Sequence, residues 1–66
     1  MSINDFLKVL ADNGYTAKSI DNVAMVLVQA TISVEKFNKI FLHVRKLAIE
    51  NEYYCSFGVA KQKGNE

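Results

Sequence analysis

The chain has 66 residues, a formal net charge of +1 and one cysteine, and half of its residues are hydrophobic. This length accommodates one domain and leaves no room for a second. The nearly neutral charge excludes a general electrostatic attraction to nucleic acid or to an anionic membrane. We therefore expect a single domain over residues 1–60, followed by a disordered polar tail over residues 61–66.

The hydrophobic core of so small a domain is marginal, because only about 60% of the surface of the unfolded chain is buried on folding. Small proteins compensate with disulfides, a metal or association. Cys55 is alone and cannot form a disulfide within the chain. His43 is the only other soft ligand, whereas zinc takes about four. We therefore expect association, as a homodimer or with another protein, and neither metal nor cofactor.

The sequence also indicates a compartment. A lone cysteine is typical of a reducing environment, and we find no signal-peptide pattern at the start of the chain. The longest apolar run, residues 23–28, is far shorter than the roughly 20 residues of a membrane helix. The sequence predicts a cytoplasmic protein that does not bind membranes.

The first predicted element is a short amphipathic helix. Ser2 is a good N-cap residue, and Asp5 three residues later gives an approximate capping box. The pair Asn13-Gly14 ends the helix, with Gly14 suited to a left-handed conformation. The apolar residues at helical spacing are Ile3, Phe6, Leu7, Leu10 and Ala11.

The stretch that follows, residues 15–32, allows two interpretations. Its β-branched residues favour a hairpin, with strands over residues 15–20 and from Val23 onward, joined by a turn at Asp21-Asn22. The alternative is a helix capped by Ser19. That helix would carry an apolar stripe of Ile20, Val23, Ala24, Leu27 and Ala30. We favour the hairpin, because Met25, Val26 and Val28 lie outside the helical stripe.

A second, longer helix begins after Ser33, its predicted N-cap, and is expected to fray around Asn51. Its apolar face consists of Val34, Phe37, Ile40, Phe41, Val44, Leu47 and Ala48. Residues 53–60 then alternate aromatic and smaller residues, which predicts a strand. The predicted fold is a small αββαβ domain of the α+β class, with a three-stranded sheet and both helices on one face. The alternative is three helices and a C-terminal strand, similar to a winged helix.

With both helices on one face, the other face of the sheet is open and apolar. It would carry either Val23, Met25 and Leu27 or the intervening set, together with one alternating set of the last strand. The more apolar set of that strand is Tyr53, Cys55, Phe57 and Val59. Open apolar faces mark interfaces, so we expect association through the sheet or its edge.

No pattern of a catalytic centre is present. The chain lacks nucleophile-elbow, zinc-protease, phosphate-loop and dinucleotide motifs, and its three glycines are isolated. His43 and Cys55 could pair in principle. However, His43 lies on the polar side of the long helix, and a lone cysteine is usually a small buried apolar residue. We expect a protein that is not an enzyme, with a buried Cys55.

The candidate binding residues lie on the long helix and the last strand. At about 100° per residue, Lys36, Lys39, His43 and Lys46 form one basic stripe. Leu42 and Ile49 lie on the far flank of this stripe, off the main apolar face. The predicted partner-binding residues are Lys36, Lys39, Leu42, His43, Lys46, Tyr53, Tyr54 and Phe57.

Two functions are compatible with these features. The preferred one is a small inhibitor or adaptor that binds a macromolecular partner, a host or defence protein in particular. A composition rich in Asn and Lys and without Pro or Trp favours a phage or mobile element as its source. The alternative is a helix-turn-helix DNA-binding regulator, which requires residues 19–31 to be helical. The nearly neutral charge argues against this alternative.

Overall fold

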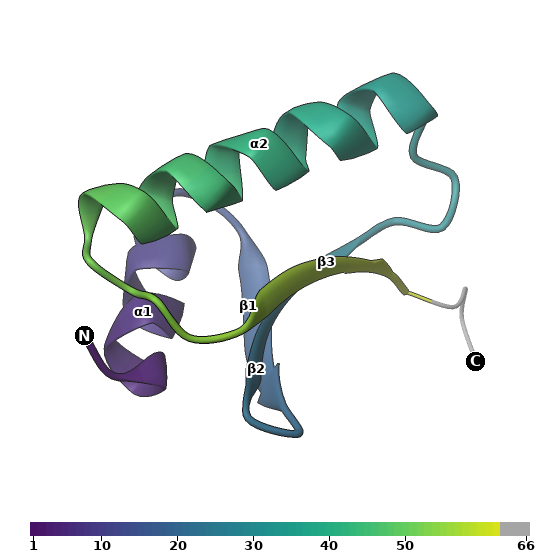
Figure 1. Ribbon diagram of the computed structural model, residues 1–66. Coiled ribbons are helices and arrows are strands. Elements are labelled where there is room, and N and C mark those ends of the chain that lie inside the picture. Colours follow the sequence, from purple (N-terminus) through teal and green to yellow (C-terminus); the bar gives the residue numbers. More distant parts are fainter. Residues whose placement is uncertain (63–66) are drawn as a thin grey trace.

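The computed structural model describes residues 1–62 and shows an open three-stranded sheet with two helices (Figure 1). The elements are α1 (Ile3–Asp12), β1 (Thr16–Ile20), β2 (Val23–Val28), α2 (Val34–Glu50) and β3 (Phe57–Lys61). The sheet order is β1-β2-β3. The predicted αββαβ fold of the α+β class is therefore confirmed. Among residues 1–62, no helix combines the length and apolar character needed to cross a membrane.

Local signals place both ends of α1 where the sequence predicts them. Asp5 donates its backbone N–H to Oγ of Ser2 at 3.2 Å, which satisfies one of the free donors of the first turn. Gly14 has φ of 87°, a left-handed conformation that glycine adopts without a steric penalty. The chain then turns into β1, so α1 lies directly beside the hairpin.

The hairpin forms because the Asp21-Asn22 turn supplies two left-handed residues. Their φ angles are 51° and 64°, as a two-residue turn between antiparallel strands requires. Ile20 pairs with Val23, and the register continues to Thr16 opposite Leu27. The alternative fold, with a helix over residues 19–31, is therefore wrong. The β-branched residues of β2 pack better in a sheet than in a helix.

The last strand is shorter than predicted, because the chain turns sharply after α2. Glu52 adopts φ of 55°, and Tyr53 donates its backbone N–H to the carbonyl of Ala48 at 2.8 Å. These features end the helix in a left-handed cap and direct Tyr53 into the core. Residues 53–56 are a loop, and the predicted strand over 53–60 begins only at Phe57. β3 then pairs parallel with β2.

The predicted polar tail over residues 61–66 lies partly outside the described residues. Lys61 still belongs to β3, and Gln62 donates its N–H to the carbonyl of Val28 at 2.7 Å. β3 thus extends one residue past the predicted domain boundary at residue 60. Residues 63–66 lie outside the described part of the chain.

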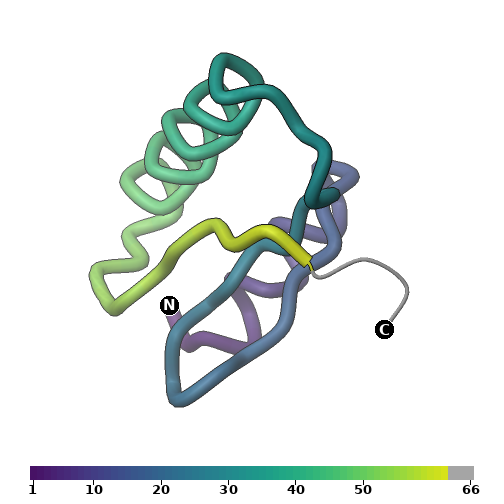
Figure 2. Tube along the Cα trace, turned by 90° about the vertical axis from the view of Figure 1, so that its right-hand side faces the viewer, coloured from purple at the N-terminus to yellow at the C-terminus, as the bar shows by residue number. Residues whose placement is uncertain are grey.

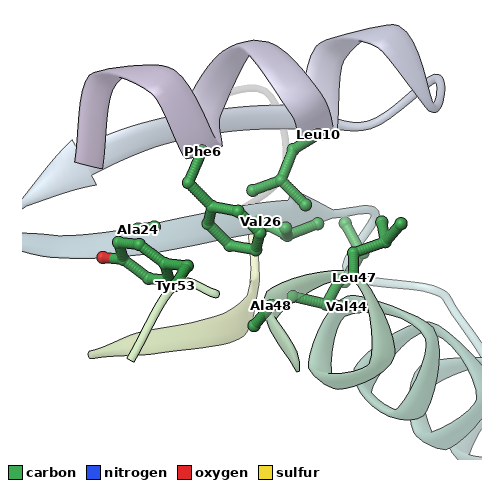
Figure 3. Packing of buried hydrophobic residues seen from close by; sticks show 9 residues of the cluster. Phe6, Leu10, Ala24, Val26, Val44, Leu47, Ala48 and Tyr53 are labelled. Carbon is green, nitrogen blue, oxygen red and sulfur yellow. The ribbon is translucent and has the colours of Figure 1, made fainter. Parts of the chain in front are cut away.

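The core lies between the two helices and one face of the sheet (Figure 3). Phe6 of α1 stacks on Tyr53, with ring centroids 4.3 Å apart and planes inclined by 9°. Buried side chains of both helices meet those of β2, which confirms that the helices share one sheet face. The buried set is Phe6, Leu10, Ala24, Val26, Val28, Val44, Leu47, Ala48 and Tyr53.

The opposite face of the sheet carries Val23, Met25 and Leu27, which are half-buried. Gly58 and Ala60 extend this face onto β3, because they pair with Met25 and Leu27. The sequence left open which alternating set of the last strand lies on the open face, and the structure places Phe57 and Val59 on the core side instead. Both residues pair with core-facing positions of β2 and pack against the core.

Candidate functional site

The basic stripe predicted on the long helix is exposed on α2. Lys36, Lys39, His43 and Lys46 are all exposed, on successive turns of one side of the helix. Lys46 Nζ lies 4.0 Å from a carboxylate oxygen of Glu50, which follows it on the same side. This pair is exposed and contributes little to stability. Lys36 and Lys39, toward the N-terminal end, make no ion pair within residues 1–62.

His43 ties this stripe to the start of the hairpin. Its Nδ1 is hydrogen-bonded to the hydroxyl of Tyr15, and the two rings meet edge-on with centroids 5.6 Å apart. Burial raises the pKa of the Tyr15 phenol, so this hydroxyl stays protonated at neutral pH. Tyr15 directly precedes β1. The basic stripe therefore faces the β1 side of the sheet.

A cleft opens beside the stripe, between the first turns of α2 and the end of the sheet. Its volume is about 680 Å³, within the range of clefts that bind small-molecule ligands. Lys36 and Ser33 line it from α2, and Tyr15 lines it from the hairpin side. The complete lining is Gly14, Tyr15, Thr16, Leu27, Val28, Gln29, Thr31, Ile32, Ser33, Lys36, Ile40 and Gln62.

The remaining predicted residues lie on a different surface. Leu42 is 59% exposed on the other flank of α2, and Tyr54 is 80% exposed in the loop before β3. Phe57 is half-buried and packs near Phe41, with ring centroids 5.9 Å apart. Tyr53 is only 2% exposed, and its hydroxyl donates to the carbonyl of Ser56. Tyr53 is thus a core residue and is unavailable to a partner.

We name the second surface the apolar flank, defined by Val34, Phe41, Leu42, Ile49 and Tyr54. At about 100° per residue, its four helical members lie on one side of the core face of α2 and the basic stripe lies on the other. The Phe41–Phe57 contact places the Phe41 border of this flank beside β3, whereas Leu42 and Ile49 point to solvent. The eight predicted binding residues therefore divide between two surfaces and the core.

The residues that could ligate a metal or act as a nucleophile lie apart in the described part of the chain. No three His, Cys, Asp or Glu side chains within residues 1–62 are grouped to hold a metal ion. Cys55 is exposed, so the expectation of a buried thiol is wrong. Cys55 lies in the loop before β3, so it does not follow the alternation of buried and exposed side chains along that strand. Exposure leaves this thiol accessible to solvent.

Sequence reasoning missed the cleft and the role of Tyr15. Tyr15 was visible only as a residue after the glycine turn, and its contact with His43 spans 28 positions of the chain. Residues 29–33, which form part of the cleft, are a connection without periodicity. The helical spacing of the lysines was the only available signal, and it located one wall of the site.

Comparison of the chain with protein-family models, with curated protein sequences and with solved structures finds no match in any of the three.

Proposed function

We propose that this chain is a small non-enzymatic inhibitor or adaptor that binds a protein partner through the basic stripe and the adjoining cleft. The observation that carries the proposal is the position of Lys36, which belongs both to the stripe and to the rim of the cleft. A cation beside a partly apolar hollow fits an acidic segment that bears an apolar side chain. The partner we propose is therefore a protein with such a segment.

The charges of α2 support an acidic partner. Lys36 and Lys39 are exposed and make no ion pair within residues 1–62. The hydrogen bond between Tyr15 and His43 fixes the imidazole ring between these lysines and Lys46. Complementary charges at the rim of an interface raise the rate of association and select the partner. The composition that favours a phage or mobile element makes host and defence enzymes the first partners to examine.

The fold weighs against the DNA-binding alternative. A helix-turn-helix places one helix after another across the turn, whereas residues 23–28 form a strand here. The net charge of +1 is also far from the basic footprint of such domains.

The test is affinity capture from the lysate of the native cell, with and without nuclease, using tagged wild-type protein and two variants. Lys36→Glu/Lys39→Glu reverses the stripe beside the cleft. Lys8→Glu/Lys18→Glu is the matched control, with the same charge change at exposed positions of α1 and β1. We expect one protein that survives nuclease, is retained by the control and is lost with the stripe variant.

Two results would contradict the proposal. Equal loss of the partner with both variants would show that only overall charge matters. Recovery dominated by nucleic acid that disappears after nuclease treatment would favour the DNA-binding alternative.

A further inference from the structure

The outer edge of β3 is a row of free backbone groups. In a parallel pair, alternate residues of a strand bond to the neighbour and the others face away. Ala24 donates to the carbonyl of Ser56, and Gln62 donates to the carbonyl of Val28. In the register between these two bonds, the backbone N–H and C=O groups of residues 56, 58, 60 and 62 point toward β2. The N–H and C=O groups of Phe57, Val59 and Lys61 therefore point away from the sheet.

Within residues 1–62, no hydrogen bond uses these outward groups. The side chains around them are apolar and half-buried over residues 57–60. An unpaired edge of this kind is a template for another strand unless charge, proline or a covering element protects it. β3 has no proline, and its one charged residue, Lys61, is at its end.

Phe41, at one border of the apolar flank, lies on the same side of the molecule as this edge. Phe41 contacts Phe57 of β3, whereas His43 contacts Tyr15 beside β1, and β1 and β3 are opposite edges of the sheet. In Figure 2, β3 in yellow lies between α2 and the hairpin of β1 and β2. Phe41 therefore adjoins the free strand edge, whereas Leu42 and Ile49, about 160° and 140° from the buried Val44 around the helix, point to solvent.

We propose that this surface binds a second copy of the chain, with β3 pairing antiparallel to β3 of the partner about a twofold axis at Val59. The pairing places Val59 opposite Val59 of the partner subunit and Lys61 opposite Phe57 of the partner subunit. The free backbone groups of Phe57, Val59 and Lys61 then face the free backbone groups of the same three residues in the second copy. Antiparallel strands form hydrogen-bonded pairs in this way. The product is a continuous six-stranded sheet.

The charge distribution favours this occupant. The twofold register opposes no two like charges, because each Lys61 faces an aromatic ring. The lysines of α2 lie on the flank that faces β1, away from the seam between the two copies. Arg45 lies about 40° from Phe41 around the helix, on the side of α2 that faces β3. Interfaces are depleted of charge, with arginine as the exception.

Two proline variants test the pairing at matched positions. Val59→Pro removes an outward N–H of β3 and leaves the bonds to β2 in place, because those use Gly58, Ala60 and Gln62. Ser19→Pro is the control at the other edge. Ser19 pairs with Ala24, whose N–H bonds to β3, so the N–H of Ser19 also points outward. Proline is tolerated in edge strands at such positions.

We expect sedimentation equilibrium to give twice the 7.4 kDa monomer mass for the wild type and for Ser19→Pro. Val59→Pro should weaken the dimer about 100-fold, because two hydrogen bonds are lost per dimer and the ring obstructs the edge. A reductant is present throughout, since the exposed Cys55 would otherwise form a disulfide between copies. Circular dichroism confirms that each variant is folded.

Hydrogen exchange in the wild type gives a second measurement that does not depend on a variant folding. The amides of Phe57, Val59 and Lys61 should become protected as the protein concentration rises, while the amide of Ser19 exchanges rapidly throughout. A monomer across the concentration range, or a dimer with a rapidly exchanging Val59 amide, would overturn the proposal. So would a dimer that Ser19→Pro dissociates. Partner capture by the basic stripe is measured separately and is unaffected by any of these outcomes.

Discussion

The two edges of the sheet, β1 and β3, are built from the same number of residues but face solvent differently. β1 is exposed at four of its five positions and carries Lys18 in its middle. β3 is half-buried at four of five positions and has its lysine only at the end. A charged side chain in the middle of an edge strand discourages pairing with another chain. The molecule thus protects one edge and leaves the other available.

The elements that cover the sheet reinforce this difference. α1 packs over the hairpin, and α2 packs over β3. The side of α2 that faces β1 carries the lysines and His43, whereas the side toward β3 carries Phe41, and Leu42 and Ile49 are exposed on the outer face of the helix. One helix therefore separates a charged surface from an apolar one. If both proposals hold, this separation lets the acidic partner and the second copy bind at the same time.

The largest effect is expected from the aromatic stack that anchors β3. Phe6→Ala removes a fully buried ring from against Tyr53, which precedes β3, and should cost about 3–5 kcal/mol of unfolding free energy. Phe41→Ala removes the same atoms from a side chain that is 39% exposed, and should cost clearly less. Denaturant unfolding of both variants measures the difference. Equal losses would show that the stack does not anchor the core.

The second effect concerns the protected edge. Lys18→Val/Ser19→Val removes the charge of β1 and gives it the β-branched side chains of a pairing strand. Because a dimer through β3 leaves a β1 edge at each end, the variant should associate end to end into open assemblies. Light scattering should then report a mass that rises with concentration beyond that of the wild type.

Lys8→Val is the control for that experiment, since it removes the same charge from an exposed position of α1. It should leave the mass unchanged. A double variant of β1 that keeps the wild-type mass would mean that its charge does not protect this edge.

Much of this asymmetry was predictable from local patterns. The caps of both helices, the Asp21-Asn22 turn and the order of the elements follow from residues close together in the sequence. The face on which each strand residue lies did not follow where a loop intervened. Cys55 belongs to the same alternating set as Phe57 and Val59, yet the strand begins only at Phe57, and the loop before it leaves the thiol exposed while those two residues pack against the core.

The candidate site was only partly predictable, for the same reason. The lysine stripe could be predicted, because it depends only on the spacing of residues along one helix. The cleft, the Tyr15–His43 contact and the free edge of β3 depend on which distant segments meet. Long-range packing decides these features, and neither periodicity nor capping signals encode it.

A third, smaller effect is a loss of stability at alkaline pH. Burial, with a contribution from the nearby Cys55, raises the pKa of Tyr53 above its ordinary value of about 10. The unfolded chain then releases this proton at lower pH than the folded chain. The stability that the neutral phenol contributes is fully present below about pH 10 and is lost as the pH rises through the folded pKa.

Tyr53→Phe should flatten this alkaline decline in the free energy of unfolding, while the exposed Tyr54→Phe should leave it unchanged. At neutral pH, Tyr53→Phe also loses the hydrogen bond to Ser56, at a cost of about 1 kcal/mol. Tyr15 precedes the other edge, and burial raises its pKa in the same direction. Tyr15→Phe should therefore remove a further part of the decline, and an unchanged decline in both core variants would exclude the tyrosines as its cause.

The smallest expected effect distinguishes dimerisation through the edge of β3 from dimerisation through the open face of the sheet. A Cβ atom at Gly58 would lie 3.3 Å from the sulfur of Met25, a tight contact with a flexible side chain on the half-buried open face. The methionine can move away, so Gly58→Ala should stabilise the fold by roughly 0.5 kcal/mol through the reduced entropy of the unfolded chain. Because the change lies on the open face and leaves the outward groups of β3 intact, dimerisation should be unaffected. If Gly58→Ala dissociates a dimer that Val59→Pro leaves intact, the two copies meet through the open face, and the free edge of β3 is not their interface.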